Sequence, residues 1–484
     1  MHRLHCSSLR FALMLALLAA QGPALAARLD PGLPDRLAGL DVAGAVEVIV
    51  TFEGEGPPDG QDLALLSGLG LKGITLRGLP VAGVLATGGQ VQALLASGQV
   101  RSVWFNAPLQ YEGGGAASTA DVKQAHTGSP VHGRGMPYSG RGVGVLVNDS
   151  GVDGKHRDLR YPEHVVQNVA GRVDLHAATA LGPVSYTEDV ADTDQAGGHG
   201  TLVAGIVGGT GHVSDRGRFK GVAPGADIIG YGSGPGLSTL DALGGFDYAL
   251  THQFEYNIRV IAGSFGNSAD TGTPFDPDDP VNVATKALAD RGVVVVFPAG
   301  NAGSAEATIT GNFKKAPWVV TVGAGDNGGG LSVYSSRGSN GNRGRVQVGG
   351  EVYHWVDRPT VTAPEASADP GRVGTSMAAP HVSGIVALML EANPALSWRE
   401  VKRILQETAT RIPGRTAWEA GAGHANAHAA VQAALGAGDP GATVHLNRRL
   451  DGRAAGPSTA GDRSGTGSTH VRGSGPVRTE TGDG

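Results

Sequence analysis

Three polar residues far apart in the 484-residue chain could together activate an alcohol. Ser376 lies in the segment GTSMAAPH at 374–381, His199 lies between two glycines, and Asp149 follows an apolar stretch at 143–148. Serine is a weak nucleophile until a neighbouring imidazole takes its proton, and a carboxylate must orient that imidazole. We therefore expect Asp149, His199 and Ser376 to converge, with the serine hydroxyl as the nucleophile.

The local sequence predicts that Ser376 lies at the start of a helix. It is preceded by Gly-Thr and followed by small residues and an apolar run that reaches residue 390. Pro380 is expected to be tolerated because it falls in the first helical turn. A hydroxyl there lies near unpaired backbone N–H groups and the positive helix end, which stabilise a developing oxyanion. An isolated serine of this kind would be an ordinary helix N-cap, but the histidine and the aspartate upstream favour catalysis.

The elements that must position these residues alternate between strand and helix. Buried strands are expected at 143–148, 227–231, 258–262, 292–297 and 318–322, and helices at 201–207, 239–251, 281–290, 397–408 and 426–435. Continuous apolar strands separated by helices predict an α/β fold with a doubly wound, mostly parallel sheet and helices on both faces. Ligands of such sheets bind beyond the carboxyl ends of the strands.

Several blocks of this sequence resemble the subtilisin-like serine protease family, the subtilases. The blocks are DSG at 149–151, HGT at 199–201, GVAPGA at 221–226, PAGN at 298–301, SSRG at 335–338 and GTSMAAPH at 374–381. One block is weak evidence, whereas the whole set in the order Asp, His, Ser is specific. The resemblance covers about 142–435 and implies a secreted serine endopeptidase that is made as a zymogen and cuts peptide bonds through an acyl-enzyme.

The resemblance also implies a role for each matching residue. Ser376 would be the nucleophile, His199 the general base and acid, and Asp149 the group that holds the imidazole. The side-chain amide of Asn301 and the N–H of Ser376 would bind the oxyanion. Without the other blocks, Asn301 would be read as a turn residue in its Gly-Asn-Ala-Gly context.

Two substrate-binding edges follow from the same resemblance. An extended peptide would add as a β-strand between them. The residues concerned are Ser264, Phe265 and Gly266 on one edge, Gly232, Ser233 and Gly234 on the other, and Ala299 and Gly300 beside the oxyanion site. Taken alone, these stretches would be a strand end and a glycine turn.

The sequence departs from the family pattern in a few places. Leu202 stands where the family usually has histidine, and we expect it to pack in a helix. Phe265 stands where tryptophan is frequent, which would alter the pocket wall. The stretches 161–195 and 340–357 look like inserted loops, the second with a hairpin formed by 346–348 and 352–355.

Residues 1–26 have the features of a secretory signal. Arg3 and Arg10 supply the positive charge, 11–20 is apolar, and Ala-Leu-Ala at 24–26 is a cleavage site. A transmembrane anchor is the alternative, but the apolar run is short for a bilayer. Cleavage would remove Cys6, the only cysteine, and leave an extracellular or periplasmic protein without disulfides.

The rest of the chain divides into three parts. Residues 27–115 comprise an α+β unit of predicted order βαββαβ and a glycine-rich linker, and they resemble the family's inhibitory propeptide. The alternative is a permanent accessory domain; if it is a propeptide, processing is expected at Tyr111 or Glu112. The subtilisin-like catalytic domain is expected at 116–436 and a disordered tail rich in Gly, Ser and Arg at 437–484.

Composition limits the partners. The net charge of −6 gives no case for nucleic-acid binding, and no later stretch is apolar enough to anchor the chain in a membrane. The expected partners are protein or peptide substrates and the chain's own propeptide in cis.

The predicted chemistry requires no cofactor and no catalytic metal. Structural Ca²⁺ is common in the family, but we favour a solvated acidic loop for Asp270, Asp276, Asp278 and Asp279.

Two other functions were weighed against a peptidase. A catalytically silent subtilase that binds peptides in the same groove is disfavoured because all four catalytic positions are occupied. An α/β-hydrolase esterase is disfavoured because the chain has no Gly-x-Ser-x-Gly elbow and the wrong order of catalytic residues.

Overall fold

The computed structural model describes residues 27–38, 44–112, 137–195, 197–213, 220–326, 329–365 and 373–437. All of these lie within one compact unit of the chain. The predicted signal segment with Cys6, the linker after Glu112 and the tail from residue 438 lie outside the described residues.

A seven-stranded sheet forms the centre of the larger part of the fold. Its order is β17-β14-β13-β11-β7-β10-β8, and every neighbouring pair is parallel. The strands are β7 (Gly144–Asp149), β8 (Val165–Ala170), β10 (Asp227–Gly232), β11 (Ile258–Ala262), β13 (Val294–Pro298), β14 (Val319–Gly325) and β17 (Val361–Pro364). The predicted doubly wound α/β fold is confirmed. Because β7 lies between β10 and β11, the chain reverses direction across the sheet beside this strand.

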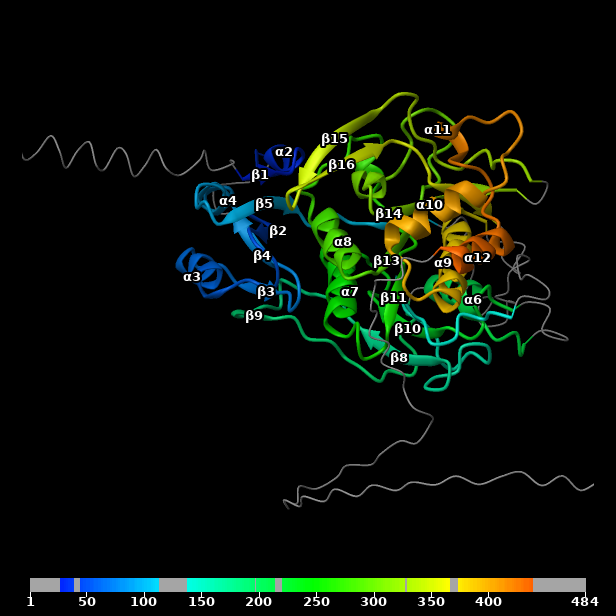
Figure 1. Ribbon diagram of the computed structural model, residues 1–484. Helices are drawn as coiled ribbons and strands as arrows, with labels where there is room; N and C mark the ends of the chain where they lie inside the picture. Colours follow the sequence, from blue (N-terminus) through cyan, green and yellow to red (C-terminus); the bar gives the residue numbers. More distant parts are fainter. Residues whose placement is uncertain are drawn as a thin grey trace, which may run out of the picture. The chain divides into compact units, whose positions relative to one another are not determined.

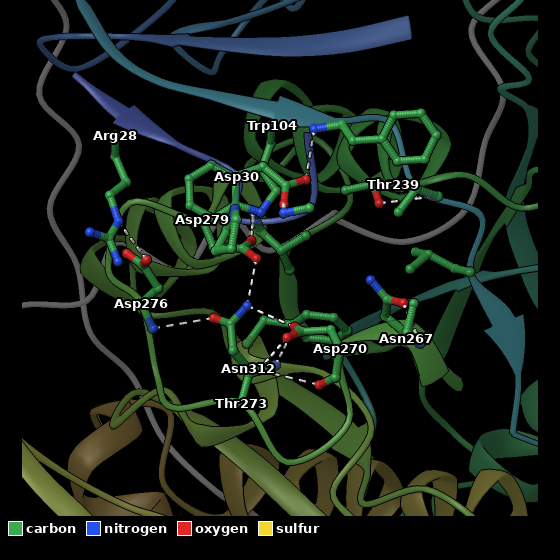
Figure 2. Close-up of a pocket in the computed structure, with 18 of the residues that line it drawn as sticks. Arg28, Asp30, Trp104, Thr239, Asn267, Asp270, Thr273, Asp276, Asp279 and Asn312 are labelled. Carbon is green, nitrogen blue, oxygen red and sulfur yellow. Dashed lines mark hydrogen bonds and ion pairs between the residues drawn. The ribbon is translucent and has the colours of Figure 1, made fainter. Parts of the chain in front are cut away.

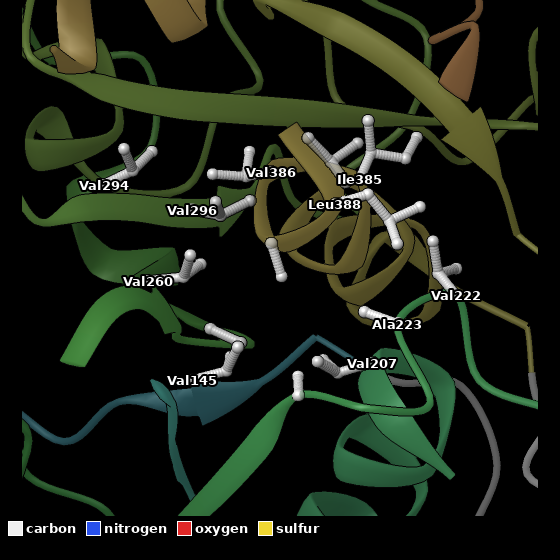
Figure 3. Packing of buried hydrophobic residues seen from close by; sticks show 14 of the residues in the cluster. Val145, Val207, Val222, Ala223, Val260, Val294, Val296, Ile385, Val386 and Leu388 are labelled. Atoms are coloured by element: carbon white, nitrogen blue, oxygen red, sulfur yellow. The ribbon is translucent and has the colours of Figure 1, made fainter. Parts of the chain in front are cut away.

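Helices cover both faces of this sheet (Figure 1). On one side lie α6 (His199–Gly208), α9 (Thr375–Ala392), α10 (Trp398–Thr408) and α12 (Ala427–Gly436); on the other lie α7 (Thr239–Thr251) and α8 (Pro280–Asp290). Val145 and Val147 pack into the core on the α9 side, the cluster in which Figure 3 shows Val296 beside Val386, and Leu146 packs on the α7 side. Alternate residues of one strand are therefore buried on opposite faces, which is why these strands are apolar throughout.

The N-terminal part forms the predicted βαββαβ unit. Its elements are β2 (Ala45–Phe52), α3 (Gly60–Gly68), β3 (Gly73–Thr75), β4 (Val81–Thr87), α4 (Gly88–Leu95) and β5 (Val100–Phe105). The residues before β2 form two further elements that the sequence did not predict, β1 (Arg28–Leu29) and α2 (Leu33–Ala38). The last strand of the unit, β5, ends at Phe105.

The prediction of an inserted loop at 161–195 was wrong in two places. β8 is an edge strand of the main sheet and pairs with β10, while β9 (Leu181–Pro183) pairs with β3 of the N-terminal unit. The polar residues Gln167 and Asn168 interrupt the apolar pattern of β8, and Asn168 donates from Nδ2 to the Val152 carbonyl at 2.9 Å. The hairpin predicted within 340–357 is confirmed as β15 (Arg343–Val348) and β16 (Glu351–Val356).

Pro380 lies inside α9, not in its first turn, because the helix begins at Thr375. A proline there cannot donate the usual hydrogen bond to the carbonyl four residues earlier, which belongs to Ser376. The hydroxyl of Ser264 donates to that carbonyl at 3.2 Å instead. The missing backbone hydrogen bond is thus replaced by a side chain from beyond β11.

The acidic loop at 270–279 contacts the N-terminal unit. Asp276 pairs with Arg28 at 3.0 Å and Asp278 with Arg101 at 2.7 Å, while the carboxylates of Asp270 and Asp279 accept hydrogen bonds from Asn312. Figure 2 shows Arg28, Asp270, Asp276, Asp279 and Asn312 among the residues that line a cavity of about 340 Å³. The carboxylates are thus engaged by arginine and amide groups, a more specific arrangement than a solvated loop.

Two features are absent from the residues that the structure describes. No helix in the described ranges is both long and apolar enough to span a membrane. Within the same residues, no cluster of three or more His, Cys, Asp or Glu side chains is arranged as a metal site.

Candidate active site

Asp149 and His199 meet at the carboxyl end of the parallel sheet. Asp149 is the last residue of β7, and His199 is the first residue of α6, whose N-cap Gly198 has φ +79°. The Nδ1 of His199 and the Oδ1 of Asp149 are 2.7 Å apart, and Oδ1 also accepts the Ser150 N–H at 2.7 Å. A Cβ on Gly200 would clash with the Gly151 carbonyl, so this glycine allows α6 to lie close to the end of β7.

Ser376 is the second residue of α9 and is fully buried. Its Oγ donates to the Ser264 carbonyl at 3.1 Å, and the Nε2 of His199 has no hydrogen-bond partner among the residues that the structure describes. The hydrogen bond between hydroxyl and imidazole that the chemistry requires is therefore not formed in this state. Behind both residues, Leu202 packs with Met377, so Leu202 is buried as predicted.

A short segment of the chain itself covers both residues. The ring of Tyr111 lies over the His199 ring with 5.0 Å between centroids, and burial, together with the nearby Asp149 charge, raises the pKa of this tyrosine. The carbonyl of the next residue, Glu112, accepts the Ser376 N–H at 3.1 Å. The imidazole and the serine thus face two consecutive residues of one peptide.

Asn301 completes a pair of donors on the same carbonyl. Its Nδ2 donates to the Glu112 oxygen at 2.7 Å. Its Oδ1 accepts the N–H of Thr375 at 3.0 Å and the hydroxyl of Thr375 at 2.9 Å, which fixes the amide orientation. The sequence analysis missed this orienting role of Thr375, although its position directly before Ser376 was a signal.

The covering segment is bound as an added β-strand along the edge predicted at 264–266. β6 (Gln110–Tyr111) pairs antiparallel with β12 (Phe265–Gly266), and the Glu112 N–H donates to the Ser264 carbonyl at 3.2 Å. The side chain of Phe265 points into the core, where its ring lies against those of Phe246, Phe297 and Phe313.

The second predicted edge, residues 232–234, contacts the covering segment through Gly234. The carbonyl of Gly234 accepts the Tyr111 hydroxyl at 2.8 Å. Gly232 belongs to β10, and the N–H of Ser233 donates to the Asp149 carbonyl at 3.0 Å, so this stretch holds the end of β7. The backbone partner of the covering segment on this side is instead Leu237, whose carbonyl accepts the Leu109 N–H at 2.8 Å.

Ala299 and Gly300 lie beside the side chain of Glu112. The Ala299 carbonyl accepts the Thr310 N–H at 3.2 Å, and a Cβ on Gly300, where φ is +116°, would clash with Thr310. Thr310 and Lys314 contact the Glu112 carboxylate, and neither was predicted. The adjacent lysines 314 and 315, directly before a buried strand, were the available signal.

Together, the fold and the sequence define a class of hydrolase. A sequence profile of the Subtilase family matches residues 140–438, more than half of the chain. The chain belongs to the subtilase family of serine endopeptidases.

Over the aligned residues, the named relatives are a little over a quarter identical to this chain. The serine protease AprX of Bacillus subtilis (strain 168) is 28% identical over 357 residues, which are 69% of this chain and 74% of AprX. Subtilisin E of the same organism is 29% identical over 62% of this chain and 68% of its own length. Alkaline elastase YaB from Bacillus sp. (strain YaB) is 28% identical over 61% of this chain, which spans 66% of that protein.

Two solved structures share the fold. Fervidolysin from Fervidobacterium pennivorans, a keratinolytic enzyme related to subtilisin, has a TM-score of 0.53 at 19% identity, covering 80% of this chain and 61% of its own. The epidermin leader peptide processing serine protease EpiP from Staphylococcus aureus has a TM-score of 0.56 at 17% identity, covering 80% of this chain and 99% of its own.

Proposed function

We propose that this protein is an exported serine endopeptidase, made as a zymogen, that hydrolyses peptide bonds in proteins through an acyl-enzyme on Ser376. The observation that carries the proposal is the position of the Glu112 carbonyl. It accepts hydrogen bonds from Asn301 Nδ2 and the Ser376 N–H while its own segment is paired as a β-strand with β12. These are the contacts expected of a bound peptide substrate.

In the proposed mechanism, the Ser376 hydroxyl rotates from the Ser264 carbonyl toward His199. Its oxygen attacks the carbonyl carbon of the substrate while its proton passes to Nε2 of His199. Asp149 holds Nδ1–H and stabilises the imidazolium, and Asn301 with the Ser376 N–H binds the oxyanion. The imidazolium then donates its proton to the leaving amine, and water, deprotonated by His199, hydrolyses the acyl-enzyme. The proposed steps use only these groups and water, so they require no cofactor.

The N-terminal unit is proposed to act as an inhibitory propeptide. Tyr111 and Glu112 occupy the groove above His199 and Ser376, and the unit is attached through the Arg28 and Arg101 ion pairs. Asp247 also accepts the N–H groups of residues 77–79. Cleavage between residues 112 and 113 would release this segment, and residues 1–26 would direct the chain out of the cytoplasm.

Mass spectrometry of the purified protein, with and without a serine-directed fluorophosphonate, tests this function. We expect a mature chain that begins at residue 113 and one adduct on the peptide containing Ser376. A full-length chain without adduct would favour the other candidate, a catalytically silent peptide-binding protein, because its groove would stay filled by its own N-terminal segment.

Asn301→Ala should lower kcat by about 10²–10³-fold with little change in KM, a loss already measured for an oxyanion-hole asparagine in subtilisin. The amide contacts the oxygen on which charge develops, so its contribution is largest in the transition state. Steady-state kinetics on a chromogenic peptide measure this effect. Asn342→Ala, which removes an amide bound to Asp357 on the second inserted stretch, is the control and should leave kcat unchanged. A rise in KM with unchanged kcat would contradict the assignment of Asn301 to the oxyanion site.

A further inference from the structure

The side chain of Glu112 occupies a buried pocket beside the Ser376 site. Thr310 Oγ1 donates to its Oε1, and Lys314 Nζ lies 3.3 Å from the same oxygen and 2.8 Å from Thr310 Oγ1. Glu112 is buried, and the side chain of Lys314 has no exposed surface. Glu112, whose carbonyl accepts hydrogen bonds from Asn301 and Ser376, thus also places its carboxylate against a buried ammonium.

The pocket walls depend on a missing side chain. A Cβ on Gly266 would clash with the Glu112 carboxylate and would crowd both Thr310 and Lys314. Gly266 lies in β12, the strand that pairs with the bound segment. The pocket is therefore open toward the substrate strand and has a lysine at its inner end.

Lys314 has one ion-pair partner, and that partner is Glu112. Among the residues that the structure describes, no other carboxylate lies within ion-pair distance of its Nζ. The adjacent Lys315 instead pairs with Asp357, at 3.6 Å, and donates to the Thr273 carbonyl. A buried ammonium without a partner is strongly unfavourable, so the pocket of Lys314 favours an occupant with a carboxylate.

We propose that this protein is a glutamate-selective endopeptidase, in which Lys314 and Thr310 recognise a glutamate side chain on the carbonyl side of the bond that is cut. The inference rests on the proposed peptidase function, and its first substrate would be the bond after Glu112. Glutamine has the shape without the charge, aspartate is one methylene shorter, and leucine leaves the ammonium unpaired. Each of these should be cut less well than glutamate.

The protonation state of Lys314 adds a dependence on pH. Burial lowers the pKa of Lys314 to about 8, against the opposing charges of Glu112 and Asp270. Below this value the ammonium is charged and pairs with glutamate; above it the charge is lost. The preference for glutamate over glutamine should therefore shrink as pH rises through about 8.

Peptides that differ only at the residue before the scissile bond test the proposal. On the processed wild-type enzyme, kcat/KM for the glutamyl peptide should exceed that for the glutaminyl peptide on the order of 100-fold, the size of effect expected for a buried charge pair. Thr310→Val should reduce this ratio, and Lys286→Met, which removes an ammonium paired with Asp290 in α8, should leave it unchanged.

A paired substitution removes the charge without stopping maturation. Lys314→Met with Glu112→Met keeps an apolar side chain in an apolar pocket, so the chain should process and then cut methionyl and leucyl peptides with no preference for glutamate. Glu112→Met alone should process slowly, because it leaves Lys314 unpaired. Rescue by the second substitution would separate recognition from a folding defect.

The outcomes separate the two proposals. If wild-type protein is labelled at Ser376 and hydrolyses casein but shows equal kcat/KM for glutamyl and glutaminyl peptides, glutamate selectivity is refuted and the peptidase function stands. If no peptide is cut and Ser376 is not labelled, both are refuted. The wild-type ratio alone decides the matter if the paired variant fails to fold.

Discussion

Ser376→Ala should lower kcat by about 10⁶-fold, a loss already measured for the corresponding serine in subtilisin. The substitution removes the only proposed nucleophile, while the two donors to the Glu112 carbonyl, Asn301 Nδ2 and the backbone N–H of residue 376, remain. The variant should therefore still hold its own residues 110–112 in the groove. It should also stay full-length, because the bond after Glu112 can no longer be cut.

Casein hydrolysis and intact mass measure this result together. Ser383→Ala is a matched control, since Ser383 is buried in the same helix and its hydroxyl donates to the Ala379 carbonyl at 3.3 Å. The control should mature and hydrolyse casein as the wild type does. Full casein hydrolysis by Ser376→Ala would refute the catalytic assignment.

Asp149→Asn should lower kcat by about 10⁴-fold at neutral pH, as in the Ser-His-Asp proteases where this change has been made. In the wild type, Oδ1 of Asp149 accepts hydrogen bonds from both His199 Nδ1 and the Ser150 N–H. An asparagine amide has one oxygen and one NH₂ group, and with the NH₂ group toward Nδ1 it holds the imidazole in the wrong tautomer, with its proton on Nε2. Such an imidazole cannot take the proton of Ser376.

Single-turnover or steady-state kinetics on one peptide test this expectation. Asp247→Asn is the control, because Asp247 is an equally buried carboxylate that binds the backbone at 77–79 and Tyr186, away from His199. It should change the attachment of the N-terminal unit and leave kcat intact. Activity of Asp149→Asn within tenfold of the wild type would remove Asp149 from the mechanism.

The proposed zymogen is expected to be inactive before it is cut. The groove is filled by residues 110–112, and the Ser376 hydroxyl is turned to the Ser264 carbonyl. The same contacts that would bind a substrate hold the N-terminal segment. In the proposed zymogen, inhibition and substrate recognition would use one set of hydrogen bonds, and cleavage with release of the segment would separate them.

The sequence by itself determined most of the main sheet and the order of the helices. Strands such as 258–262 and helices such as 239–251 have the predicted bounds, because apolar runs and capping residues are local signals. The motifs around 149, 199, 301 and 376 were also recognisable, since short loops at strand and helix ends carry their identity in a few adjacent residues.

Tertiary structure alone decided what those residues touch. Strand β8 was not predicted because it contains polar residues that bond to neighbouring loops. Pro380 was predicted in the first helical turn, whereas it lies further inside the helix, where the hydrogen bond that it cannot donate is replaced by one from Ser264, more than a hundred residues away. The pocket of Thr310 and Lys314 could not be predicted from local patterns. It forms where Gly266 of β12, the short helix Asn312–Lys315 and Glu112 at the end of the N-terminal unit meet. Contacts between residues so far apart in the sequence leave no periodic signal.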